Sequence, residues 1–135
     1  MSASRTKQHE IAMSIIYQCL MLINLGQTFD VKEVIASTAE EEYENVDIYI
    51  KQVVVSSLSH IDEIKAAFIA NLRKWKFERL ALLEQALLIF SYAHYYYVGG
   101  VDKKVVINVA VNLAKKYLDE NDYKFVNAIL ENTLK

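Results

Sequence analysis

Turn-forming residues are scarce in this chain. It contains no proline and three glycines, Gly26, Gly99 and Gly100, in 135 residues. Sheet proteins need frequent tight turns, which glycine and proline normally supply. Hydrophobic residues make up 53% of the chain and charged residues 24%, an ordinary balance for a folded protein with an apolar core. The sequence therefore predicts an all-α protein with few loops, folded as a single domain over residues 1–135.

Apolar residues at helical spacing divide the chain into about seven helices. Residues 8–25 and 80–97 are apolar almost all round, so we expect two central helices around which the others pack. The β-branched run 53–55 is also typical of a buried strand, but a lone strand would have no partner, which favours a helix. The remaining helices are expected to start at Asp30, at Asn45 or Asp47, at Ser59 or Asp62, after an Asp102 cap, and after an Asn121 or Asp122 cap.

Charge and cysteine content exclude several classes of protein. The formal net charge of −2 gives no global attraction to nucleic acid or membrane, so RNA binding would need a local basic patch. Cys19 is the sole cysteine, which excludes an internal disulfide and favours a reducing compartment. The first ten residues lack the apolar stretch of a signal peptide, and residues 11–25 are too short and too polar for a membrane span. We expect a cytoplasmic protein without membrane association.

The C-terminal quarter carries the most specific pattern. It reads I-N-x-A-V-x-L-A-K-K-Y over residues 107–117 and K-F-V-N-A-I-L over 124–130. W-x-x-x-R-L-x-x-x-E spans residues 75–84, and A-x-x-x-I-Y spans 12–17. In this order and spacing the four segments resemble the NusB family. The resemblance implies two packed helical bundles, no cofactor and no catalysis.

The same resemblance implies a function in transcription antitermination. Members of the family bind the boxA element of ribosomal RNA transcripts together with the ribosomal protein NusE, and the complex acts on the transcription elongation complex. A basic N-terminal segment and the start of the last helix supply the RNA contacts. A lysine there can hold a phosphate near the positive end of the helix, and an aromatic ring can stack on a base. The residues expected to bind RNA are Arg5, Lys7, His9, Asn121, Lys124, Phe125 and Asn127.

Each RNA assignment has a plainer alternative. The N-terminal residues resemble an ordinary polar chain end with Glu10 beside them, and Phe125 can simply pack in the core. Several family positions also differ: the N-terminal arginine cluster is thinner, and the family's polar or glycine positions hold Ile89, His94, Val109, Asn112 and Ala128. These differences spare the apolar pattern and affect polar positions. The alternative function is therefore a protein-interaction scaffold that keeps the fold and has lost RNA binding.

Tyr17 and Glu84 match family positions that contact NusE. The alternatives are a core tyrosine and a solvated helix charge. Residues 73–79 interleave basic and aromatic side chains, which is typical of nucleic-acid grooves, but we favour a connector whose Trp75 and Phe77 anchor in the core.

The tyrosines at 92 and 95–97 point to different faces of a helix, so they are expected in the core or between bundles, with a homodimer contact as the alternative. His60 has no second histidine at ligand spacing, so we expect no metal site. The sequence also contains no phosphate-binding glycine loop and no nucleophile elbow.

Overall fold

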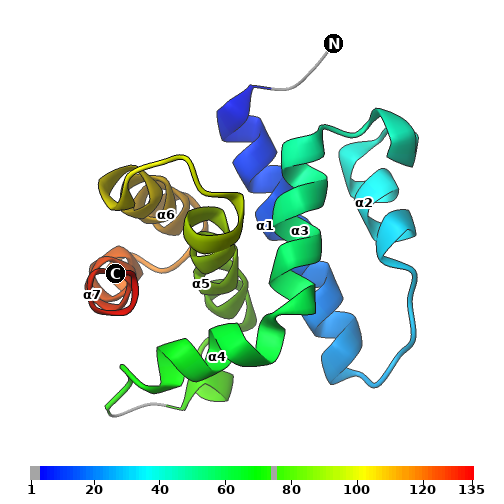
Figure 1. The fold of residues 1–135 in the computed structure, drawn as a ribbon. Helices are drawn as coiled ribbons and strands as arrows, with labels where there is room; N and C mark the ends of the chain where they lie inside the picture. The colour runs from blue at the N-terminus through cyan, green and yellow to red at the C-terminus, as the bar shows by residue number, and fades with distance from the viewer. Residues whose placement is uncertain (1–3, 74–75) are drawn as a thin grey trace.

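A computed structural model describes residues 4–73 and 76–135 as an all-helical fold (Figure 1). No described residue lies in a β-strand, and no described helix is long and apolar enough to cross a membrane. The prediction of an all-α protein with seven helices is confirmed, and residues 53–55 are helical. The α-helices are α1 (Arg5–Asn24), α2 (Val31–Ala39), α3 (Ile48–Ser59), α4 (Ile61–Ile69), α5 (Leu82–Ala93), α6 (Lys103–Tyr117) and α7 (Asp122–Thr133).

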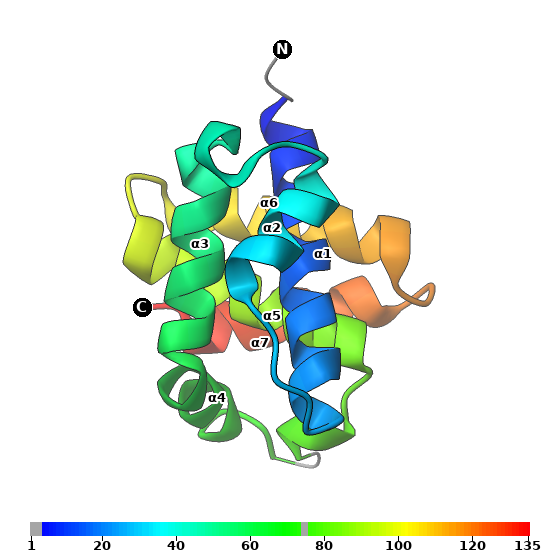
Figure 2. The same cartoon turned by 90° about the vertical axis from the view of Figure 1, so that its right-hand side faces the viewer.

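The helices form two bundles that meet along α1 and α5. In Figures 1 and 2, α2 and α3 pack on α1, while α4, α6 and α7 gather on the other side of α5. Residues 86–90 of α5 are all fully buried, and α1 buries residues on successive turns from Ala12 to Leu20. The prediction that these two nearly all-apolar helices are central is confirmed. Helices that are apolar on most sides are stable in water only when others cover them.

Side chains and one glycine set several helix ends. The Asp30 carboxylate accepts the Lys32 N–H at 2.9 Å, and the Asp47 carboxylate accepts the Tyr49 N–H at 2.8 Å. Gly26 follows α1 with φ +70°, a left-handed conformation that glycine adopts without steric cost. The predicted stops and starts at these residues are confirmed. Asp102 precedes α6 as predicted but makes no side-chain cap hydrogen bond.

The connector between α4 and α5 is anchored by an aromatic ring. Phe77 lies in a 3₁₀ turn, η2 (Phe77–Arg79), and is fully buried. Its ring stacks on Phe68 of α4 with centroids 5.9 Å apart. Arg73, Lys76 and Arg79 stay exposed. The core-anchoring interpretation is confirmed for Phe77, while Lys74 and Trp75 lie outside the described residues.

A π-helical turn, η3 (His94–Val98), extends α5 and carries most of the tyrosine cluster. Tyr97 donates a 2.5 Å hydrogen bond to Glu63 of α4, and its ring stacks on His60. Tyr96 accepts the backbone N–H of Lys135 at 2.8 Å and remains 41% exposed. The cluster therefore connects α5 to α4 and to the C-terminal end. Three of the tyrosines are half-buried against the core and none is fully buried, so the expectation of core tyrosines is met only in part. A homodimer contact through the tyrosine-rich helix stays a prediction.

Candidate functional site

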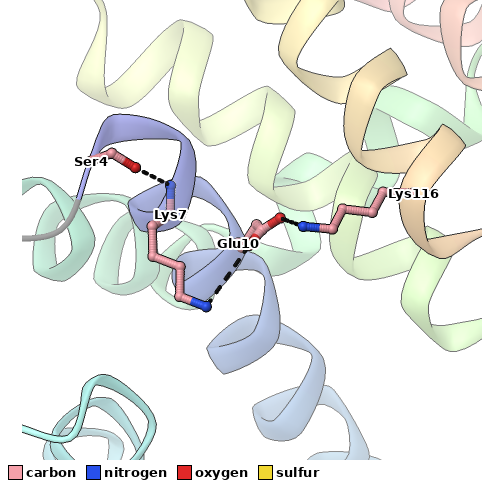
Figure 3. Close-up of polar contacts among 4 residues, drawn as sticks. All are labelled: Ser4, Lys7, Glu10 and Lys116. Atoms are coloured by element: carbon pink, nitrogen blue, oxygen red, sulfur yellow. Dashed lines mark hydrogen bonds and ion pairs between the residues drawn. The ribbon is translucent and has the colours of Figure 1, made fainter.

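The first turn of α1 presents two exposed cations. Ser4 caps the helix by accepting the Lys7 N–H at 3.2 Å (Figure 3). The Arg5 guanidinium lies 4.2 Å above the centre of the Tyr49 ring on α3, so a cation–π contact orients it. The Lys7 side chain is 63% exposed. Both cations can reach a phosphate from the helix end where the backbone dipole is also positive.

Glu10 joins this turn to α6. Its carboxylate accepts a 2.5 Å hydrogen bond from Lys116 and lies 4.0 Å from Lys7, although its side chain is only 11% exposed (Figure 3). The hydrogen bond from Lys116 is the main cause of the lowered pKa of Glu10. Glu10 therefore stays ionised and neutralises one of the two lysines. Lys7, Glu10 and Lys116 together keep a net positive charge.

His9 is directed inward, contrary to the expectation that it faces RNA. It is 8% exposed, and its ring centroid lies 5.4 Å from that of His94 and 5.7 Å from that of Tyr49. Burial and the nearby Arg5 charge lower the pKa of His9, and burial lowers that of His94 to about 4. Both rings are therefore neutral near pH 7. The sequence contained a signal for this position, because His9 precedes the buried Ala12, Met13 and Ile16 at helical spacing.

The elbow before α7 and the first turns of α7 hold the second group of predicted RNA residues. Asn121, Lys124 and Asn127 are exposed, and Phe125 is half-buried. Asn121 occupies the N-cap position of α7, as one of the two predicted caps, but makes no side-chain cap hydrogen bond. The alternative cap, Asp122, instead turns back and accepts the Asp119 N–H at 3.1 Å. The Asp122 N–H in turn donates to the Asp119 carbonyl at 3.0 Å, so these two bonds close the elbow, while Asn121 and Lys124 remain exposed.

Phe125 borders a hollow of about 400 Å³ whose lining includes three acidic residues, Glu84, Asp119 and Asp122, and one basic residue, Arg79. Glu84 is 7% exposed, and its Oε2 has no hydrogen-bond partner among the described residues. Burial, followed by the charges of Asp122 and Asp119, raises the pKa of Glu84 to about 7. The alternative of a solvated charge at Glu84 is wrong. A hollow of this chemistry favours a cationic group and disfavours a phosphate.

Tyr17 borders a second hollow, of about 500 Å³, which lies between α1, the end of α2 and the end of α6. Its ring is half-buried, so the tyrosine partly belongs to the core and partly to the surface. Leu83 lines this hollow and its chain neighbour Glu84 lines the other. The two residues expected to contact a protein partner therefore lie in hollows that border the same turn of α5.

Replacing Glu84 with glutamine is expected to stabilise the fold at pH 8 and not at pH 4. The folded-state pKa of about 7 lies above the unfolded value near 4.5, so ionisation of Glu84 opposes folding. The penalty is absent below pH 4.5 and complete above pH 7. We expect the free energy of unfolding, measured by urea denaturation at pH 8, to rise by about 1 to 2 kcal/mol, after allowing for solvent at the mouth of the hollow.

The matched control is Glu78→Gln, which neutralises an exposed carboxylate. It is expected to change the unfolding free energy by less than about 0.5 kcal/mol at either pH. An equal gain for Glu84→Gln at pH 4 and pH 8 would contradict the raised pKa.

Reactive groups are sparse in the part of the chain that the structure describes. Cys19 is fully buried in α1, and burial raises the pKa of its thiol to about 11. The thiol is therefore protonated and shielded, which makes it a poor nucleophile. No group of three or more histidine, cysteine or carboxylate side chains among the described residues is placed to hold a metal ion.

Comparison with known proteins identifies the family. The NusB family model matches residues 6–135. The chain is 32% identical over 133 residues to the transcription antitermination protein NusB of Clostridium novyi (strain NT), an alignment that covers 98% of each chain. The fold superposes on T. maritima NusB with a TM-score of 0.84 at 20% identity, covering 98% of this chain and 92% of the other. It also superposes, with a TM-score of 0.79 at 25% identity, on a chain in a crystal structure described as a plectonemic RNA supercoil, covering 96% of this chain and 92% of that one. A match by sequence and by fold over nearly the whole length places the chain in the NusB family.

Proposed function

We propose that the protein is a transcription antitermination factor that binds boxA-like single-stranded RNA of ribosomal RNA transcripts together with the ribosomal protein NusE. The observation that carries this proposal is the exposed Lys124 beside the half-buried Phe125 ring in the first turn of α7. This pair offers a phosphate contact and a stacking surface at a positive helix end. The relative from Clostridium novyi carries the corresponding name.

The proposed RNA surface has two separate ends, and the second carries a single lysine next to the acidic hollow. Arg5 and Lys7 on α1 neutralise phosphates at one end, and Lys124 does so at the other. Asn121 and Asn127 are exposed amides that can donate to and accept from base edges. His9 is left out of the proposed surface because its ring is buried.

The partner surface lies at the first turn of α5. Tyr17 offers a hydroxyl in one hollow, and Glu84 offers a carboxylate in the other. A cationic side chain of NusE entering the second hollow would relieve the repulsion between Glu84, Asp119 and Asp122. The reduced repulsion favours NusE binding. Binding of a cation also favours the ionised carboxylate, so NusE binding is coupled to the loss of a proton from Glu84.

The protein acts as a scaffold and performs no catalysis. Holding RNA and NusE on one domain keeps the leader RNA tethered to the elongating polymerase in the cytoplasm. The tether raises the effective concentration of the RNA near the enzyme. We infer that this tether suppresses premature termination and helps to complete ribosomal RNA synthesis.

Titration of labelled boxA RNA tests the proposal. We expect tighter binding than to a scrambled RNA, and a further gain in affinity when NusE is present. Repeating the titration at two salt concentrations should give a slope of log K against log salt at least as steep as about −1.4 to −2.1, the range expected when two or three phosphates of a single strand are neutralised. Equal binding of boxA and scrambled RNA with NusE present would overturn the proposal.

A second candidate function is a protein-interaction scaffold that no longer binds RNA. Two observations favour it: Glu10 engages both Lys7 and Lys116, and His9 is buried. Under this alternative NusE binds with the same affinity whether or not boxA RNA is present. The same titration therefore separates the two functions.

A further inference from the structure

Helix α6 has an unusual charge content for this chain. Its sequence, KKVVINVAVNLAKKY, contains four lysines and no carboxylate, whereas the whole chain has a net charge of −2. Two of the lysines, Lys103 and Lys104, lie in the first turn, and Lys115 and Lys116 lie in the last. A surface helix without any acidic side chain concentrates positive potential locally.

The exposed part of α6 includes a continuous polar stripe. Lys104, Asn108, Asn112 and Lys116 follow one another at intervals of four residues, and all four are exposed. Residues at this spacing form a ridge along a helix. At 1.5 Å per residue the ridge is about 18 Å long, enough for several nucleotides of a single strand. We refer to these four residues as the α6 stripe.

Shallow hollows flank the α6 stripe on both sides. The one toward α1 has a volume of about 280 Å³ and is lined by Thr6, Asn108, Asn112 and Lys116, among others. The one toward α7 has a similar volume of about 280 Å³ and is lined by Lys104, Asn108 and Asn127, among others. Asn108 lines both hollows. The stripe therefore connects the first turn of α1 with Asn127 on α7.

Two carboxylates border these hollows, and each is paired with lysine. Glu10 contacts Lys116 and Lys7 at 2.5 and 4.0 Å. Glu131 lies 4.0 Å from Lys103 across the α6–α7 contact. Glu131 neutralises Lys103, and Glu10 neutralises one of Lys7 and Lys116. The charges of Lys104, of Lys115 and of the other lysine beside Glu10 remain to attract an anion. Charge complementarity therefore points to a polyanion as the occupant.

We propose that the α6 stripe is a further RNA-binding surface, along which a single strand passes between α1 and α7. This inference rests on the proposed function. Lys104 and Lys116 contact phosphates, and Asn108 and Asn112 form hydrogen bonds with bases or ribose hydroxyls, since each amide both donates and accepts. The stripe accounts for RNA affinity in a chain whose N-terminal segment supplies few cations.

Isosteric charge variants test the stripe without removing any packing. Asn108→Asp and Asn112→Asp each place a carboxylate in the proposed path of the phosphates. We expect each to lower boxA affinity by about five- to tenfold at low salt, and the double variant to lower it further. Lys104→Ala is expected to make the salt slope shallower by about 0.7, the value for one lost phosphate contact.

The matched control is Gln52→Glu, which makes the same change in net charge on an exposed position of α3, in the other bundle (Figure 1). Melting temperatures of all variants should match that of the parent chain. If the parent binds boxA RNA specifically and the two Asp variants have the same boxA affinity as Gln52→Glu, the proposal that the α6 stripe binds RNA is wrong, while the proposed function stands. If the parent does not discriminate boxA from scrambled RNA, the proposed function itself fails.

Discussion

The Phe77→Ala substitution is expected to lower the free energy of unfolding by about 3 to 5 kcal/mol relative to the parent chain. Phe77 is fully buried and stacks on Phe68, which in turn contacts Tyr92 edge-on with ring centroids 5.9 Å apart. Removing the ring takes away its burial and leaves a cavity where the connector joins α4 to α5. The melting temperature should fall by on the order of 10 to 20 °C.

Neighbouring substitutions control for this effect. Lys76→Ala changes an exposed residue next to Phe77 and should alter stability by less than about 0.5 kcal/mol. Phe77→Leu keeps most of the apolar volume, so its loss of stability should lie between those of Phe77→Ala and Lys76→Ala. Urea unfolding monitored by circular dichroism measures all three. A loss below about 1 kcal/mol for Phe77→Ala would contradict its role as the anchor of the connector.

The fold was predictable because its determinants are local and periodic. Scarce glycine and no proline excluded a turn-rich sheet, and apolar spacing gave the seven helices with ends within a few residues of those observed. Gly26 and Asp30 marked ends through chemistry that acts within one turn. The π-helical turn His94–Val98 was not predicted, since a single extra residue in a helical turn leaves no periodic signal.

The candidate site was less predictable because its properties arise from contacts distant in sequence. Glu10 is held by Lys116, 106 residues away, and no local pattern indicates that pairing. The raised pKa of Glu84 arises partly from the charges of Asp122 and Asp119, which line the same hollow from a distant part of the sequence. His9 differs, because its spacing relative to Ala12 and Ile16 already placed it on the inner face of α1.

The Phe125→Ala variant is expected to bind boxA RNA about five- to 150-fold more weakly than the parent, the range for losing one stacked base. Its far-ultraviolet circular dichroism should be unchanged, since Phe125 is half-buried and the core contacts of α7 come from Val126, Ile129 and Leu130. Titration with labelled RNA in the presence of NusE measures the affinity.

Two further substitutions at the same position separate stacking from packing. Phe125→Leu retains apolar volume but has no aromatic face, whereas Phe125→Tyr retains the face. If the ring stacks on a base, the leucine variant loses RNA affinity as alanine does and the tyrosine variant keeps it. If the ring only packs, leucine restores the melting temperature and RNA affinity together, and the stacking role is contradicted. Because Lys124 is unchanged in all three variants, their salt slopes should be equal, so any difference in affinity belongs to the ring and not to a phosphate contact.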